Sequence, residues 1–281
     1  MSAVSHDTGH AAGSRRQLPR QAVHQFPHLT IHQFRADLRC FFRNKGSVFF
    51  TLALPVLFLV IFGSVFQHQN VAVPGGRIDE PVYYVPGIIA YGVIAATFSN
   101  LIISVVRYRE TGIYKRRRAT PLPAGAVIAA RALVAALSVL VITAVLLAIG
   151  WAAFAAHIPG RTGPAFLLDI IVGAIVFSCL GFAVASLITN IDAAQPVTLA
   201  IVLPLCFLSG VFIPILELPH WLIDVGKIFP VHALADALLA AYNPHTTGTG
   251  LRWGDLVVLT AWGAAGLIIA VRRFSWLPRG G

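Results

Sequence analysis

Residues 125–156 read GAVIAARALVAALSVLVITAVLLAIGWAAFAA, a run of apolar and small residues with one charged side chain, Arg131. As a helix rising 1.5 Å per residue this run would measure about 48 Å, whereas the hydrocarbon core of a bilayer is about 30 Å thick. The run is therefore more than long enough to cross a membrane. We expect its first turns to lie in the interface, where the Arg131 guanidinium can reach the headgroups.

Further apolar stretches with lengths typical of membrane spans precede and follow this run, at residues 47–66, 84–106, 166–188, 197–211 and 253–271. The chain is 57% hydrophobic and 11% charged, against about 25% charged residues in soluble domains. This composition excludes an ordinary soluble enzyme and a disordered protein. The sequence predicts an all-α membrane protein with six transmembrane helices.

The two ends of the chain differ from this domain. Residues 1–28 are polar and lack the apolar core of a signal peptide. They predict a disordered cytoplasmic tail, and residues 274–281 predict a second, shorter tail. The transmembrane domain is therefore expected to cover residues 29–273.

Residues 29–45, directly before the first span, alternate apolar and charged side chains at helical spacing. Phe34 lies on the apolar face, and Arg35, Arg39 and Arg43 lie on the opposite face. This pattern predicts an amphipathic helix in the membrane interface, with its basic face toward lipid headgroups or a partner. A simple membrane anchor is the alternative.

The distribution of basic residues predicts the orientation. Seventeen of the 21 Lys and Arg residues lie on the side that carries both termini and residues 107–118. The other side carries four, which are Arg77, Arg161, Lys227 and Arg252. By the positive-inside rule the first side is cytoplasmic. Topology thus explains most of the net charge of +10, and no nucleic-acid partner is expected.

Residues 212–252 are interrupted by prolines, and the apolar runs between them are too short to cross a bilayer. We expect an outer pair of helices here, re-entrant or interfacial.

The sequence lacks three common motifs of nucleotide-binding and catalytic sites. It contains no G-x-x-x-x-G-K-[ST], no H-E-x-x-H and no G-x-S-x-G. Asp169 and Asp255 lie near the ends of predicted spans, whereas an ion-coupled carrier needs ionisable groups near the midplane. We expect no enzyme activity, no metal and no cofactor in this chain. Energy for transport would have to come from a partner, or the protein conducts passively.

Residues 107–123 read RYRETGIYKRRRATPLP. A loop that only sets topology needs positive charge alone. This loop also presents an acid, Glu110, an aromatic ring, Tyr114, and an ending bounded by Pro121 and Pro123. Exposed aromatic and Arg side chains favour interfaces, so we interpret the loop as a docking surface for a partner. A purely topogenic loop is the alternative.

Two segments resemble a known family, the ABC-2 type transporter permeases, which are membrane subunits of bacterial ATP-binding-cassette exporters. The first is Arg109-Glu110-Thr111-Gly112 followed by Lys115-Arg116 and Ala119-Thr120-Pro121-Leu122-Pro123. The second runs from Leu208-Ser209-Gly210-Val211-Phe212-Ile213-Pro214 through Leu218-Pro219-x-Trp221 to Phe229-Pro230. The resemblance covers residues 29–273, and the chain is most similar to the drug-resistance (daunorubicin-like) type. Arg117 and Phe229-Pro230-Val231-His232 depart from the usual pattern.

The resemblance implies a role for each segment. Residues 29–45 would be the connecting helix, and residues 107–123 the coupling helix that fits a groove on an ATPase subunit. The implied coupling residues are Arg107, Arg109, Glu110, Gly112, Tyr114, Lys115, Arg116, Arg118, Thr120 and Pro121. The implied outer re-entrant segment contains Gly210, Pro214, Pro219, Trp221 and Pro230.

The resemblance also implies the partners. Two copies of a P-loop ATPase subunit would hold ATP and Mg²⁺, and a second permease chain would complete a homo- or heterodimer in the bacterial plasma membrane. Because charges within the spans are scarce, we expect a lipophilic or amphipathic cargo: a drug, a lipid or a lipid-linked glycan. The alternatives are an ATP-independent channel or carrier and a membrane-embedded lipid enzyme.

Overall fold

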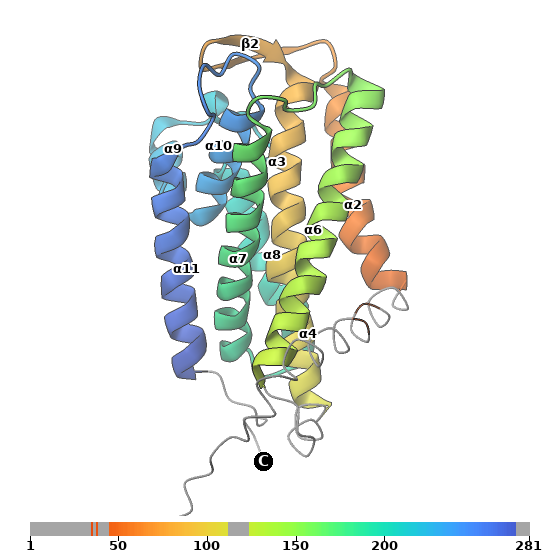
Figure 1. Cartoon of the computed structure of the whole chain (residues 1–281), viewed down its shortest axis with the longest axis vertical. Helices are drawn as coiled ribbons and strands as arrows, with labels where there is room; N and C mark the ends of the chain where they lie inside the picture. The colour runs from red at the N-terminus through yellow and green to blue at the C-terminus, as the bar shows by residue number, and fades with distance from the viewer. Residues whose placement is uncertain (1–34, 36–37, 39–44, 112–123, 274–281) are drawn as a thin grey trace, which may run out of the picture.

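The computed structural model describes residues 35, 38, 45–111 and 124–273. Within these residues the chain is mostly helical, and its long helices run side by side between two ends (Figure 1). We call the end that holds the only described strands the hairpin end, and the opposite end, where α4 finishes, the α4 end. The predicted tails, residues 1–28 and 274–281, lie outside the described residues.

Five helical stretches are long and apolar enough to cross a membrane. The first, Glu80–Glu110, consists of three consecutive elements: α3 (Glu80–Ile94), η1 (Ala95–Ser99) and α4 (Asn100–Glu110). The second is Leu133–Phe154, which lies within α6 (Ala124–Phe154). The other three are the helices α7 (Gly163–Leu187), α8 (Ile191–Leu208) and α11 (Trp253–Arg273). The helix α2 (Lys45–Val65) contains a shorter apolar stretch, Thr51–Val65. The all-α membrane architecture agrees with the prediction, and a sixth span stays a prediction.

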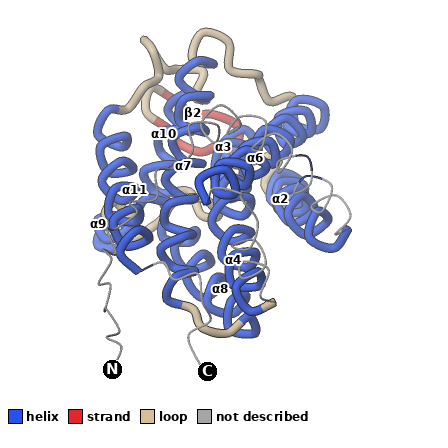
Figure 2. The backbone as a smooth tube through the Cα atoms, turned by 60° about the horizontal axis from the view of Figure 1, so that its bottom comes forward, coloured by secondary structure: helices blue, strands red, loops and turns tan. Residues whose placement is uncertain are grey.

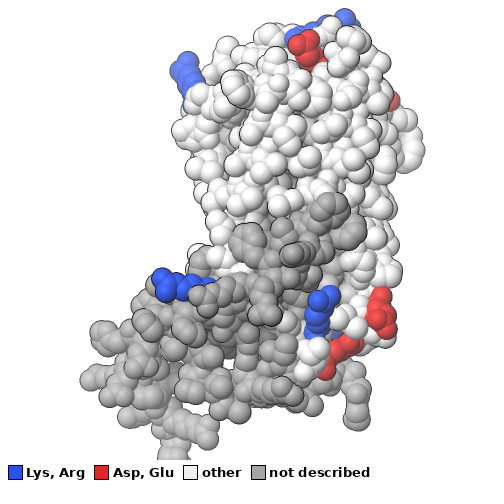
Figure 3. Space-filling view, turned by 90° about the vertical axis from the view of Figure 1, so that its right-hand side faces the viewer, with Lys and Arg blue, Asp and Glu red and all other residues white. Residues whose placement is uncertain are grey.

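Figure 3 shows the surface that such a fold requires. On this face the charged side chains gather near the two ends, and the surface between them carries none among the described atoms. A band of uncharged surface between two charged ends is typical of a helix bundle embedded in a bilayer.

The centre of the bundle is α3, in which every residue is buried. It contacts α2, α6, α7 and α10. The span that contains it begins four residues before the predicted start at Tyr84 and ends four residues after the predicted end at Val106. At its start a proline occupies the first helical turn, where its missing N–H costs nothing. At its end Arg107 and Arg109 occupy the last turn, where cations stabilise the helix dipole.

A π-helical turn, η1, interrupts this central span. Inside it the Thr97 hydroxyl donates a hydrogen bond of 2.7 Å to the Val93 carbonyl. Gly181 of α7 lies directly against it, since a Cβ there would be 3.1 Å from the Phe98 carbonyl oxygen. Single π turns within α-helices are rare and frequently occur at functional sites.

The segment between α2 and α3 turns at residues 74–76, where Gly75 has a φ of +93°. This turn joins two short strands, β1 (Asn70–Val73) and β2 (Gly76–Asp79), which pair antiparallel with Val71 opposite Ile78. Val71, Val73 and Ile78 are buried, so the strands alternate apolar and exposed residues with the period of two that a half-buried hairpin requires.

The helix α8 begins six residues before the predicted start at Val197. Its N-terminus is capped by Asn190, whose side-chain oxygen accepts a 2.9 Å hydrogen bond from the Asp192 N–H. An N-cap of this kind satisfies one of the free N–H groups of the first turn. The cap therefore sets the start of the helix, and Pro196 lies inside it. The predicted start of this span at residue 197 was therefore too late.

The predicted outer segment contains a 3₁₀ turn, η2 (Ile215–Glu217), and two short helices, α9 (His220–Gly226) and α10 (Pro230–Tyr242). Both helices lie toward the hairpin end (Figure 1). α9 is mostly exposed, whereas ten of the 13 residues of α10 are buried, against α3, α7, α8 and α11. The position of these helices relative to a bilayer stays a prediction.

Candidate functional site

The structure places three of the predicted coupling residues in the last turn of α4. These are Arg107, Arg109 and Glu110. The other seven, Gly112, Tyr114, Lys115, Arg116, Arg118, Thr120 and Pro121, lie outside the described residues. Of the predicted connecting helix, Arg35 is helical and exposed, while Phe34, Arg39 and Arg43 also lie outside the described part of the chain.

Arg109 points into the protein, although the sequence placed it on an exposed docking loop. Its side chain is 4% exposed. The guanidinium donates hydrogen bonds to the carbonyl oxygens of Ala185, at 3.4 Å, and Ile188. These carbonyls end α7, where backbone acceptors have no partner within the helix and the dipole is negative. The cation therefore caps the C-terminus of α7.

Glu110, the next residue, caps the N-terminus of the following helix, α8. Its Oε1 accepts a 2.8 Å hydrogen bond from the Ile191 N–H, the first backbone amide of α8. The N-terminus of a helix has free N–H donors and a positive dipole end, so a carboxylate there is stabilising. The side chain of Glu110 is exposed, which distinguishes it from its neighbour.

Together these two side chains join α4 to both helices that meet at the three-residue turn 188–190. We call them the Arg109–Glu110 clamp. Figure 2 shows α4 and α8 side by side at the end that faces the viewer, and α4 contacts both α7 and α8. Arg107 is exposed, and its carbonyl accepts a 2.9 Å hydrogen bond from the Thr111 hydroxyl. Sequence reasoning missed the clamp because its partners are backbone groups, which carry no residue signature.

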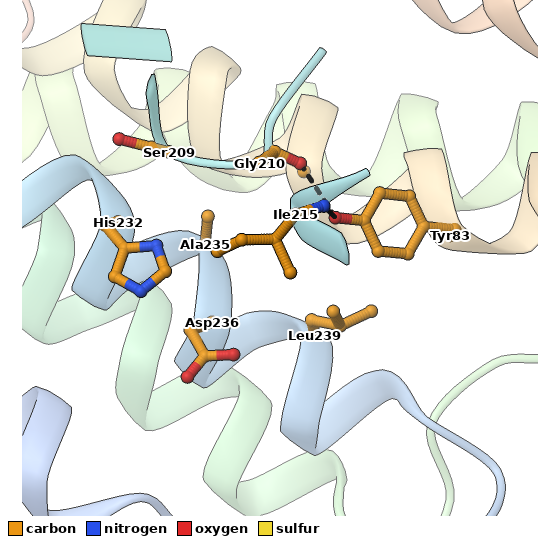
Figure 4. A pocket seen from close by; sticks show the side chains of 9 residues that line it. Tyr83, Ser209, Gly210, Ile215, His232, Ala235, Asp236 and Leu239 are labelled. Carbon is orange, nitrogen blue, oxygen red and sulfur yellow. Dashed lines mark hydrogen bonds between the residues drawn. The ribbon is translucent and has the colours of Figure 1, made fainter. Parts of the chain in front are cut away.

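The outer segment is anchored to α3 by Tyr83. Its hydroxyl donates a 3.0 Å hydrogen bond to the Gly210 carbonyl and accepts a 3.4 Å hydrogen bond from the Ile215 N–H (Figure 4). Gly210 has a φ of +75°, a left-handed conformation that glycine adopts without steric cost. Of the predicted outer residues, Gly210 and Pro214 are buried, and Pro219 and Trp221 are exposed.

Beside this anchor lies a small pocket of about 20 Å³, formed by α3, α10 and the segment after α8. His232 and Asp236 of α10 border it together with Tyr83, Ser209 and Gly210 (Figure 4). The volume suits about one water molecule. Burial lowers the pKa of His232, and the nearby Asp236 carboxylate opposes that shift. The pocket is thus too small for a cargo molecule.

Charged groups meet at the hairpin end between α10 and α11. The Arg252 guanidinium lies 3.0 Å from the Asp236 carboxylate and 2.9 Å from the Asp255 carboxylate. Asp169, in the second turn of α7, is fully buried, and neither of its oxygens has a hydrogen-bond partner among the described residues. Within the described ranges no group of three or more His, Cys, Asp or Glu side chains could hold a metal ion.

Comparison with known protein families identifies the domain. The family model described as ABC-2 type transporter matches residues 29–243, more than half of the 281-residue chain. The matched range includes the clamp, the Tyr83 anchor and α10. No curated protein matches the chain. With its apolar helices, this multi-pass membrane chain therefore belongs to the ABC-2 type transporter family and is a membrane transport component.

Proposed function

We propose that this chain is the permease subunit of an ATP-binding-cassette exporter, working as a homo- or heterodimer with two separate P-loop ATPase subunits. The observation that carries the proposal is the family match over residues 29–243. Members of the ABC-2 family typically work with an ATPase partner. ATP and Mg²⁺ would bind to that partner, and this chain would have no catalytic site of its own.

The docking surface would be the charged segment that follows α4. The sequence from Gly112 to Pro123 begins two residues after the clamp and carries Lys115, Arg116 and Arg118. A partner that binds there would act directly on the end of the central span. The connecting helix that contains Arg35 would add a second contact at the membrane surface.

The charge distribution supports the orientation. We place the α4 end in the cytoplasm of a bacterial cell, with both termini there, because 17 of the 21 basic residues fall on that side of the sequence. The hairpin end, with the predicted outer residues Gly210, Pro214, Pro219, Trp221 and Pro230, would then face outward. Cysteine labelling around Trp221 from the outside tests this orientation.

The cargo would be lipophilic or amphipathic. Charged side chains are scarce within the predicted spans, and moving a small ion into an apolar environment without charged or polar ligands costs much free energy. The drug, lipid or lipid-linked glycan would leave the cytoplasm or the inner leaflet for the outside.

The test is affinity purification of the chain from its native membranes in mild detergent, with identification of the proteins that remain bound. We expect a Walker-A ATPase with the wild type. We expect the ATPase to be lost from R116A and K115A, which remove predicted docking charges. The matched control is R161A, which removes an exposed Arg from the hairpin end and should retain the ATPase.

Two results would contradict the proposal. Purification of the chain alone in several detergents would remove its energy source and favour an ATP-independent channel or carrier. Retention of the ATPase by R116A and K115A to the same level as by R161A would show that the segment is not the docking surface.

A further inference from the structure

We infer that Arg109 and Glu110 are positioning residues that transmit movement from the end of α4 to the α7–α8 turn, rather than contacts to the ATPase subunit. The inference rests on the proposed function, in which the ATPase acts on the chain just after α4. It gives the last two residues of α4 a role that differs from that of the docking segment after them.

The direction of the side chains carries the inference. Arg109 is buried, and its guanidinium faces the carbonyls of Ala185 and Ile188. Glu110 is exposed, yet its Oε1 is engaged by the Ile191 N–H at 2.8 Å. Both side chains therefore already have partners within this chain, across 76 to 81 residues of sequence. Arg109 is buried away from a second protein, and the hydrogen bond of Glu110 directs one of its carboxylate oxygens to the start of α8.

The clamp is also suited to transmit force. Hydrogen bonds that involve an ionised group are about twice as strong as neutral ones and are directional. Each clamp residue binds the end of a helix whose dipole favours its charge. The turn 188–190 has three residues, so the end of α7 and the start of α8 cannot move far apart. A shift of the last turn of α4 must either carry the turn with it or break these bonds.

The packing of α8 extends the connection made by the Arg109–Glu110 clamp to the outer helices. Of the five spans α8 is the least buried, and its most extensive contact among described elements is with α4. Its next most extensive contacts are with α9 and α10 of the outer segment. Movement of α4 would thus reach the hairpin end along α8. This route connects the docking side to the outer helices through a single helix.

Two thiols can report such movement without knowledge of the cargo. Cys179 lies on α7 and is partly buried, and Cys206 lies on α8 and is fully buried. In a C40S background they are the remaining cysteines of the chain. The labelling rate of each thiol by a membrane-permeant maleimide is measured in the complex with its ATPase, with and without ATP and vanadate.

Glu110 is the residue to change, because removal of the buried Arg109 also risks the fold. E110A removes the acceptor, whereas E110Q keeps an amide oxygen that can accept the same hydrogen bond. D192N is the matched control: Asp192 is an exposed carboxylate in the same first turn of α8, so the variant loses a charge near the same helix end without losing the clamp.

We expect nucleotide to change the labelling of Cys179 or Cys206 in the wild type, in E110Q and in D192N. In E110A the ATPase should remain bound at the wild-type level, while the nucleotide-dependent change falls by about fivefold or more, the lower range of allosteric coupling. If E110A keeps the ATPase but loses the nucleotide-dependent change in labelling, Glu110 transmits movement and is not needed for docking.

Three results would overturn the inference. One is an E110A complex that responds to nucleotide like the wild type. Another is loss of the ATPase from E110A, which would make Glu110 a docking residue while leaving the proposed function intact. The third is a wild-type complex in which neither thiol responds, because the α7–α8 pair would then not move. Failure of any ATPase to bind the wild type would instead contradict the proposed function.

Discussion

Replacement of Tyr83 by Phe should loosen the outer segment by a measurable amount. Tyr83 is buried, with 5% of its surface exposed. Its hydroxyl donates a 3.0 Å hydrogen bond to the Gly210 carbonyl and accepts a 3.4 Å hydrogen bond from the Ile215 N–H. Y83F removes one polar atom and leaves two backbone groups without this partner. A net hydrogen bond is worth about 1 kcal/mol, and a buried polar group left unpaired costs about 1–3 kcal/mol.

The second bond is long, so we count only the Gly210 carbonyl as losing its partner. The free energy of unfolding should then fall by about 1–3 kcal/mol, the cost of one buried polar group left unpaired. For chains of 150–250 residues each kcal/mol lowers the melting temperature by about 2–4 °C. We therefore expect a fall of about 2–12 °C in the apparent melting temperature of the purified protein in a fixed detergent.

The matched control is Y91F. Tyr91 lies on the same helix, is 6% exposed, and its ring packs against those of Phe58 and Phe212. This variant makes the same chemical change without removing a described hydrogen bond, and it should melt close to the wild type. Equal melting temperatures for Y83F and Y91F would refute the claim that Tyr83 anchors the outer segment.

Two further changes test the hairpin end. G226A should lower the melting temperature strongly, because the added Cβ would lie 2.4 Å from the Leu208 carbonyl oxygen. G254A is the control and should melt like the wild type, because no atom lies within 4 Å of its added Cβ. Similar melting temperatures for the two variants would contradict the close approach of Gly226 to Leu208. Acidification from pH 7.5 to 5.5 should lower stability through His232: its pKa is lowered in the folded state, so below about 6.5 the unfolded chain binds the proton more readily. The pH dependence of melting should be weaker in H232Q but unchanged in H220Q, and a slope in H232Q equal to that of the wild type would remove His232 as the cause.

The apolar spans could be predicted from the sequence because the bilayer requires long uncharged helices. The predicted run of residues 125–156 appears as α6, Ala124–Phe154. Prolines were less reliable guides. The predicted span began at residue 197, directly after Pro196, but the Asn190 cap sets the start of α8 at Ile191. Local capping chemistry was visible in the sequence, and it outweighed the proline.

The candidate site was only partly predictable. The charged loop and the family resemblance pointed to the residues after α4, but charge alone does not show which way a side chain points. Arg109 and Arg107 are two residues apart on one helix and therefore face different directions. One is buried against α7 and the other is exposed. The partners of Arg109 are main-chain carbonyls, which every residue type carries, so no sequence pattern could reveal them.

The π turn η1 decides which side chain of α4 meets α7. Each residue of an α-helix advances the direction of its side chain by about 100°. A π turn accommodates one extra residue, so Ala95–Ser99 offsets the angular phase of α4 relative to α3 by about that amount. Deletion of one residue from this turn would leave the hydrophobicity of the span nearly unchanged. It would rotate Arg109 about a quarter of a turn away from the carbonyls of Ala185 and Ile188, so the length of the span, counted to a single residue, is itself part of the site.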